Sequence, residues 1–312
     1  MSRTRGPSPH ALSTSAGTVA LHDDPAILFF DDLALNLLDN VVRRTGRPQR
    51  ILDAIYRDPA ANPQWGFPSV FRDPTSDRWR MTYCAWDREW KRYPLLADSA
   101  DGLAWTPTDT TSVWNDERRT YPHQAFFAEG YSEWPTAVVD PFAPPGERIK
   151  GLVIHHPNRL HITTSLWTSA DGVRWRQKPG VEWQRIGSDP GTFVFRDRDR
   201  GAWSITSRPD WTDRRIAISR TADWVGFSEP ELLLQADALD EPLTEIYGLP
   251  VIPYGGIYVG LLWLYHTVPQ VEGASPHKFK GGHVDCQLAY SLNGSLPRCL
   301  HVSGPWLGRG LA

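Results

Sequence analysis

Short runs of apolar and β-branched residues, separated by polar turns, follow one another along most of the chain and predict β-strands. A strand, a polar turn and a second strand occur in four places: residues 68–74 and 78–83, 135–141 and 148–154, 191–197 and 202–206, and 249–254 and 257–262. A helical period is allowed only in residues 32–43, where a strand fits equally well. The pattern therefore predicts an all-β protein.

A turn of the form Ser-Ala-Asp-Gly followed by Trp occurs at residues 99–105 and again at 169–175, with degenerate copies at 219–224 and 291–294. Asp-Gly and Asn-Gly favour the tight turns that join antiparallel strands, and a Trp three residues after the Gly can pack over the hairpin. Each copy follows one of the four strand pairs, so each repeat is expected to hold four short strands. Such repeats are typical of β-propeller blades.

The repeats also predict how the domain is organised. Four units lie between Trp65 and the C-terminus, and residues 26–32 add one more strand. Propellers often close their ring by pairing strands from both chain ends, because closure removes exposed sheet edges. We therefore expect a five-bladed β-propeller of four-stranded antiparallel blades, with an incomplete last blade, formed as a single domain by residues 24–312. Residues 1–23 are polar, lack a signal-peptide core and are expected to be a disordered leader.

Composition and charge exclude several classes of protein. With 312 residues, 40% of them hydrophobic and 22% charged, the chain can bury a large core. Its 33 basic and 36 acidic residues nearly balance, which argues against a nucleic-acid partner. No apolar run approaches the roughly 20 residues that cross a bilayer, so no membrane partner is expected. The three Cys lack metal-site spacing and are expected to be reduced thiols, which favours a cytoplasmic location.

Carboxylates mark the start of the innermost predicted strand in three consecutive repeats: Glu133, Asp189 and Glu245. A propeller binds ligands at its axis, where the innermost strands begin, so these acids are expected to converge there. Carboxylates held close together titrate at separated pH values, which leaves one charged and one protonated near neutral pH. Glycoside hydrolysis uses such a pair beside aromatic rings. The alternative that each acid only caps a strand or binds a structural ion stays open.

Other side chains near the strand starts are expected to contact substrate because they are aromatic, basic or acidic: Asp32, Trp65, Trp134, Arg215, Tyr247 and His283. The pair Arg214-Arg215 suits a carboxylate or phosphate. His123, His155, His156 and His161 lack metal-site spacing. No phosphate-binding, dinucleotide-binding or nucleophile-elbow motif occurs, so no metal and no cofactor are expected. Five other Trp recur within the repeats and are expected to pack in the blades: Trp79, Trp105, Trp175, Trp203 and Trp224.

The blade pattern, the Ser-x-Asp-Gly-x-x-Trp turns and the axial acids resemble the five-bladed β-propeller glycoside hydrolases, which include invertases, levansucrases and arabinanases, and the related mannoside phosphorylases. Residues 29–32, 187–192 and 237–248 look like blade starts of that group. The resemblance implies a glycosidase that acts on a furanoside or related glycoside. It also implies that three acids serve as nucleophile or base, transition-state stabiliser and general acid. Asp189 and Glu245 are the first choices, Glu133 the third, and Asp31 or Asp32 a further alternative.

One departure from that group keeps another function open. Trp65-Gly66-Phe67 stands where the first-blade aspartate is usual, so a non-catalytic glycan-binding propeller or an inactive paralogue is one alternative. A phosphate-dependent glycoside phosphorylase is another. The triplet Arg72-Asp73-Pro74 matches one found in invertase-like enzymes, but it follows the first inner strand, so we expect an ordinary turn far from the axis.

Overall fold

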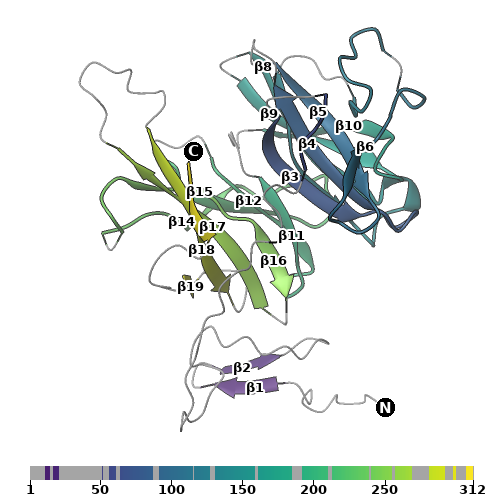
Figure 1. The fold of residues 1–312 in the computed structure, drawn as a ribbon. Helices are drawn as coiled ribbons and strands as arrows, with labels where there is room; N and C mark the ends of the chain where they lie inside the picture. Colours follow the sequence, from purple (N-terminus) through teal and green to yellow (C-terminus); the bar gives the residue numbers. More distant parts are fainter. Residues whose placement is uncertain are drawn as a thin grey trace, which may run out of the picture.

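The computed structural model describes residues 11–14, 17–20, 51, 56–60, 64–86, 91–114, 116–126, 131–158, 161–184, 192–209, 213–238, 240–254, 257–268, 281–291, 298–299 and 307–311. These residues form an all-β propeller of antiparallel blades (Figure 1). The only helical element among them is a short 3-10 turn, η1 (Pro145–Glu147). None of the described helices has the length and apolar character of a membrane span.

Each of the first three blades is a four-stranded antiparallel sheet. Blade 1 contains β3 (Gln64–Arg72), β4 (Trp79–Trp86), β5 (Arg92–Ser99) and β6 (Trp105–Pro107). Blade 2 contains β7 (Tyr131–Val139), β8 (Ile149–Asn158), β9 (His161–Ser169) and β10 (Trp175–Gln184). Blade 3 contains β11 (Phe193–Asp197), β12 (Ala202–Ser207), β13 (Ile216–Thr221) and β14 (Glu231–Leu234). The predicted strand–turn–strand repeats are therefore confirmed.

Blade 4 has a divided inner strand. It contains β15 (Thr244–Gly248), β16 (Val251–Tyr254), β17 (Ile257–Thr267), β18 (Gly282–Ser291), β19 (Arg298–Cys299) and β20 (Leu307–Leu311). Both β15 and β16 pair with the long strand β17, and the register shifts beside Gly248. A Cβ at Gly248 would lie 2.6 Å from the Trp263 ring. A glycine is therefore needed where the inner strand passes over this indole.

A separate two-stranded hairpin precedes the blades. Its strands, β1 (Ala11–Thr14) and β2 (Gly17–Ala20), pair only with each other among the described strands. The hairpin lies within the expected leader, whose boundary at residue 23 stays a prediction. The alternative helix or strand at residues 32–43 lies outside the described residues.

The Ser-Ala-Asp-Gly turns fold as predicted. Gly102 and Gly172 have φ of +77° and +72°, a conformation that only glycine adopts without strain. In the second copy, Ser169 accepts a hydrogen bond from the Gly172 amide (2.9 Å), and Asp171 accepts one from the Val173 amide (2.9 Å). The Trp175 indole donates to the Gly172 carbonyl (2.9 Å) and so closes the turn.

The third copy of the turn has a different register from the one the sequence suggested. Thr221 takes the capping role, because its hydroxyl accepts from the Trp224 amide (2.9 Å). Trp224 therefore occupies the glycine position, with φ of +63°. Its buried indole donates to Asp140 of blade 2 (2.9 Å). Phe227 packs against the same core as Trp203. Trp224 is a packing residue, as predicted, but it packs from the turn itself.

The triplet Arg72-Asp73-Pro74 forms the β3–β4 turn, as expected. The Asp73 carboxylate accepts a hydrogen bond from the Thr75 amide (2.8 Å), and the Asp73 amide donates to the Arg78 carbonyl (2.8 Å). This turn follows β3, at the end opposite the strand start. The triplet therefore has an ordinary turn role.

Apolar side chains join each blade to the next. Blades 1 and 2 share a cluster that includes Phe71 and Trp167, blades 2 and 3 share one with Leu152 and Ile205, and blades 3 and 4 share one with Ile216. Each such buried side chain contributes about 1.5–3 kcal/mol. Among the described residues there are four blades, and no apolar cluster joins blade 4 to blade 1. The expected fifth blade is not among them.

Candidate functional site

The structure places the predicted catalytic acids as follows. Glu133 lies near the start of β7, opposite Ile154, and Glu245 lies near the start of β15, opposite Tyr265. Only the backbone of Glu133 is described. Asp189 lies outside the described residues. The predicted convergence of the three carboxylates therefore stays a prediction.

Three of the expected substrate contacts have no described side chain. Trp65 lies in β3 and Trp134 in β7, and only the backbone is described at both positions. Asp32 lies outside the described residues. Tyr247, Arg215 and His283 are described, as is Glu245.

Glu245 is held by a loop of the neighbouring blade. Its side chain is buried, with 6% of the residue exposed, and its carboxylate accepts a hydrogen bond from the Arg214 guanidinium. Arg214 lies in the segment that precedes β13 of blade 3, and its carbonyl accepts a hydrogen bond from the Ile246 amide (2.9 Å). Arg214 thus holds the edge of β15 through its backbone carbonyl and pairs with the charged Glu245 through its side chain.

Two tyrosines and a second arginine complete this group, which we call the Glu245 cluster. The Tyr247 and Tyr265 rings lie edge to face, with centroids 5.6 Å apart. The Arg214 guanidinium carbon lies 5.1 Å from the Tyr265 centroid, and that of Arg208 lies 5.0 Å from the Tyr247 centroid. A buried anion, two cations and two aromatic rings can bind a polar, hydroxyl-rich ligand and orient it over a ring face.

Arg215 is directed elsewhere. Its guanidinium hydrogen-bonds the Asp213 carboxylate and the Gln235 side-chain oxygen (3.1 Å). The hydrogen bond to Asp213 raises the pKa of Arg215. The expected substrate contact of Arg215 stays a prediction, and its neighbour Arg214 is the one that reaches Glu245.

His283 lies on the other face of the blade 4 sheet from Tyr265. Side chains alternate along a strand, and Tyr265 and His266 are consecutive in β17. His266 pairs with His283, and the two imidazole rings stack with centroids 4.8 Å apart. Asp285, two residues further along β18, hydrogen-bonds His266.

Burial and the adjacent Asp285 charge raise the pKa of the Cys286 thiol to about 11, so this thiol stays protonated near neutral pH.

A second polar group forms around Tyr83 of blade 1. Asp58 accepts hydrogen bonds from the Tyr83 hydroxyl (2.5 Å) and the Ala60 amide (2.8 Å), and His123 Nε2 lies 2.7 Å from it. The Asp58 and His123 side chains are 0% and 3% exposed. Because solvent does not reach these side chains, we assign them a structural role.

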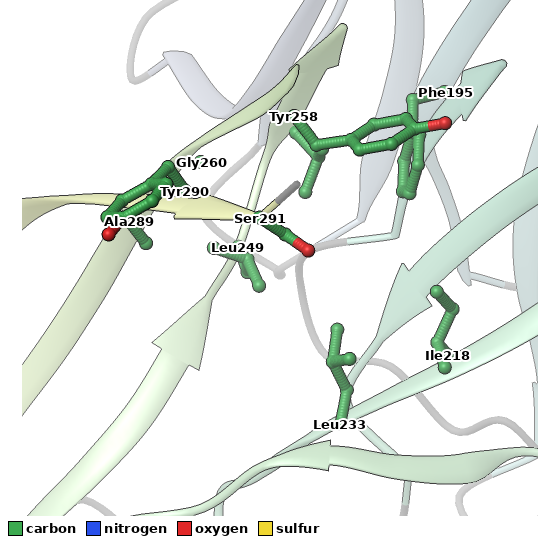
Figure 2. Close-up of a pocket in the computed structure, with 10 residues that line it drawn as sticks. Phe195, Ile218, Leu233, Leu249, Tyr258, Gly260, Ala289, Tyr290 and Ser291 are labelled. Carbon is green, nitrogen blue, oxygen red and sulfur yellow. The ribbon is translucent and has the colours of Figure 1, made fainter. Parts of the chain in front are cut away.

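The pocket between blades 3 and 4 is apolar (Figure 2). Its volume is about 30 Å³, and it is lined by side chains such as Phe195, Ile218, Leu249 and Tyr258. The Tyr258 hydroxyl donates to Asp197 (3.1 Å), and burial together with nearby carboxylates raises its pKa to about 12. Ligand sites need a few convergent polar groups as well as apolar walls. This pocket is therefore a packing gap between blades.

The residues of blade 4 and its neighbouring loop that were not predicted include Arg208, Arg214 in its role at Glu245, Tyr265 and His266. Tyr265 and His266 follow from the antiparallel register of β15, β17 and β18, which places them opposite Glu245 and His283 respectively. The alternating pattern of β17 carries that signal. Arg208 and Arg214 flank the connection between β12 and β13, and no sequence pattern predicts which strand such a connection contacts.

Comparisons with known proteins identify the fold. No family model and no curated protein sequence matches the chain. A thermostable family-43 glycoside hydrolase matches with a TM-score of 0.53 and 12% identity over 80% of this chain and 76% of that chain. An N-acetylgalactosamine deacetylase from F. plautii, solved with blood group B trisaccharide, matches with a TM-score of 0.53 and 14% identity over 84% and 76%. A protein solved as an RGII complex matches with a TM-score of 0.52 and 15% identity over 80% and 77%. The chain thus has the β-propeller fold of the glycoside hydrolases that its sequence resembles.

Proposed function

We propose that the protein is a glycosidase that hydrolyses a furanoside or a related glycoside, with an oligosaccharide or glycoside as substrate. The observation that carries this proposal is the Glu245 cluster: a buried carboxylate at the start of an inner strand, paired with Arg214 and flanked by Tyr247 and Tyr265. The shared fold supports it, because two of the similar structures are a glycoside hydrolase and an enzyme solved with a trisaccharide.

The ion pair suggests which role Glu245 takes. Both mechanisms of glycoside hydrolysis need one carboxylic acid that protonates the leaving oxygen and one carboxylate that attacks the sugar or activates water. The pair with Arg214 holds Glu245 as an anion, which suits the second role or the stabilisation of a cationic transition state. Asp189 and Glu133 are then the candidates for the general acid, and both precede Glu245 along the chain.

The test compares Glu245→Gln with Glu231→Gln, an exposed glutamate of blade 3 that pairs with Arg220. Hydrolysis of nitrophenyl arabinofuranosides and fructo- and arabino-oligosaccharides is followed, with circular dichroism to check folding. Loss of a catalytic carboxylate lowers kcat by about 10²-fold or more, whereas the control should keep full activity. Full activity in folded Glu245→Gln would overturn the proposal. So would sugar-dependent tryptophan quenching without turnover in the natural protein, or turnover that requires phosphate.

We also propose that the propeller ring has five blades. The inner strands neighbour one another in the order β3, β7, β11 and β16. Among the described elements, no comparable contact joins the inner strand of blade 4 to that of blade 1. A four-bladed ring would close directly between these blades, so a further blade between them explains the arrangement. A structure determined by crystallography would test the count, and direct packing of blade 4 on blade 1 would refute it.

A further inference from the structure

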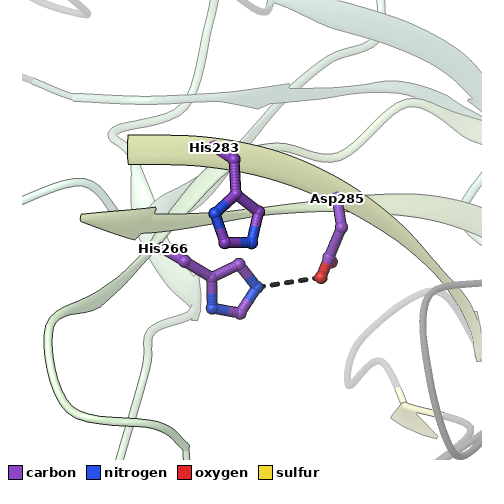
Figure 3. Close-up of side chains that lie close together, drawn as sticks. All are labelled: His266, His283 and Asp285. Atoms are coloured by element: carbon purple, nitrogen blue, oxygen red, sulfur yellow. Dashed lines mark hydrogen bonds and ion pairs between the residues drawn. The ribbon is translucent and has the colours of Figure 1, made fainter. Parts of the chain in front are cut away.

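Three side chains with metal-binding atoms meet on one face of blade 4. His266 of β17 pairs directly with His283 of β18, and Asp285 follows two residues later on the same face. One ligand atom of each residue lies within 4.8 Å of those of the other two. Figure 3 shows the two imidazole rings face to face, with the Asp285 carboxylate at the edge of the His266 ring.

The donor atoms of this group, which we call the His266 cluster, are incompletely satisfied. His266 Nε2 lies 2.9 Å from Asp285 Oδ2. Asp285 is buried, with 6% of the residue exposed, yet its second oxygen, Oδ1, has no hydrogen-bond partner among the described residues. Buried carboxylate oxygens in native proteins are nearly always hydrogen-bonded or bound to a cation. An oxygen left free beside two imidazoles therefore points to a cation.

A carboxylate lies near each ring nitrogen of His266. A metal-binding histidine binds the ion with one ring nitrogen and donates the other N–H to a carboxylate or carbonyl, which orients the ring. Here Nε2 faces Asp285, and Nδ1 lies 3.4 Å from the carboxylate of Glu241 without forming a hydrogen bond to it. The Glu241 segment is anchored beside β17, because the Thr267 hydroxyl donates to the Leu243 carbonyl (2.7 Å). Leu243 has φ of +67°, a strained conformation for leucine.

A glycine allows the two histidine strands to approach. Gly282 precedes His283 and pairs with Thr267 at the end of the β17–β18 ladder. A Cβ at Gly282 would lie 2.2 Å from the His266 carbonyl oxygen. Any other residue would force the strands apart at the point where the imidazoles meet.

We propose that His266, His283 and Asp285 bind a divalent transition-metal ion such as zinc. Two imidazole nitrogens and one carboxylate oxygen suit zinc, iron, cobalt or nickel, whereas calcium and magnesium prefer oxygen ligands alone. Ligand atoms bound to one zinc ion lie roughly 3–3.5 Å apart, given metal–ligand distances of about 2.0–2.2 Å. Nε2 and Oδ2 lie 2.9 Å apart, and the ligand atoms of all three residues lie within 4.8 Å of one another, so small side-chain movements would bring them to that spacing. Three protein ligands leave positions for water or a bound molecule.

This site is distinct from the Glu245 cluster and does not rest on the proposed glycosidase activity. Tyr265 contacts the Glu245 cluster, and His266, the next residue, points to the opposite face of the sheet. The metal would therefore sit beside β17 and β18, on the sheet face opposite the Glu245 cluster. Metal binding at this site can be measured without any substrate.

The experiment titrates the full chain, stripped of metal with a chelator and dialysed, with Co²⁺ and Zn²⁺. Cobalt is followed by its visible absorption and zinc by competition with a chromophoric chelator. We expect one ion per chain. His283→Gln and Asp285→Asn should each weaken binding at least about 100-fold. His155→Gln, a histidine of blade 2, should bind as the natural protein does.

Glu241→Gln gives a second measurement that does not depend on the folding of core variants, because the Glu241 side chain is 81% exposed. Loss of a carboxylate that orients a metal-bound histidine should weaken affinity about 10–100-fold. Absence of stoichiometric cobalt or zinc binding by the natural protein would overturn the proposal. Unchanged affinity in folded Asp285→Asn, or binding of calcium or magnesium in preference to zinc, would overturn it as well.

Discussion

The buried Asp58, which accepts a hydrogen bond from Tyr83 of blade 1, allows a prediction whose size depends on pH. Burial alone would raise the pKa of Asp58, but hydrogen bonds from the Tyr83 hydroxyl and the Ala60 amide, together with His123, lower it below its usual value. Burial, followed by the hydrogen bond to Asp58, raises the pKa of Tyr83. Near neutral pH the pair is therefore a charged carboxylate and a neutral phenol.

Tyr83→Phe removes the hydroxyl and keeps the ring that packs in the core of blade 1. A hydrogen bond to a charged group contributes about 1.5–3 kcal/mol, so the variant should lose that much free energy of unfolding at pH 7. A carboxyl whose pKa is lowered in the folded state contributes stability above its unfolded pKa of about 4. That contribution is lost as pH falls through the folded pKa. The difference between the natural protein and Tyr83→Phe should therefore be largest near neutral pH and shrink below about pH 4.

Urea unfolding followed by tryptophan fluorescence at several pH values measures this difference. Tyr254→Phe is the control, because Tyr254 is 53% exposed and should lose less than about 0.5 kcal/mol. A Tyr83→Phe difference below about 0.5 kcal/mol at pH 7 would refute the assignment of a charged, hydroxyl-bonded Asp58. A difference that stays constant down to pH 3 would refute the linkage to its titration.

Three further predictions concern the backbone and the contacts between blades, and urea unfolding measures each. Gly172→Ala and Gly102→Ala should both lose about 1–2 kcal/mol because φ is positive at each position. The loss at Gly172 should be larger, because a Cβ there would lie 3.1 Å from an aromatic ring of blade 1, whereas a Cβ at Gly102 would lie 3.5 Å from an indole, an ordinary contact distance. Equal losses would contradict this reasoning. Thr206→Val removes the hydroxyl that donates to the Leu249 carbonyl of blade 4 (2.7 Å) and should lose about 1–3 kcal/mol, whereas no loss would show that this bond does not join the blades. Gly282→Ala should lose about 3 kcal/mol or more by overpacking, and a near-neutral result would disprove the close strand approach.

The turns that repeat from blade to blade could be predicted because their contacts are local. Ser169, Asp171 and Gly172 act within one turn, and each role follows from the residue type alone: a hydroxyl cap, a carboxylate cap and a positive φ. The third turn was misaligned because Trp224 carries the positive φ, which is rare for a large residue. Its cost is offset by burial of the indole and its hydrogen bond to Asp140 in the neighbouring blade, and neither contact is visible in the sequence.

The candidate site was only partly predictable, because some of its residues follow from a local strand pattern and others from contacts between strands or blades. Glu245 and Tyr247 follow from the alternating pattern at a strand start. Arg214 joins them through a loop of another blade, and that contact depends on how the blades pack. His266 needed the register of β17 against β18, which a connection of fourteen residues between the two strands does not fix. The absence of metal-site spacing in the sequence was therefore a weak argument, since cross-strand ligands need no spacing.

Both groups of blade 4 depend on one register. Tyr265 and His266 are neighbours in β17, so one serves the Glu245 cluster and the other the His266 cluster. A slip of one residue would exchange the two faces and destroy both groups. Two glycines prevent such a slip, one in each strand that flanks β17. Gly248 passes the Trp263 ring at the bulge of β15, and Gly282 lets β18 approach the His266 carbonyl. The two polar groups are thus chemically separate but share one structural requirement, so the residues that fix the register matter to both without contacting a ligand.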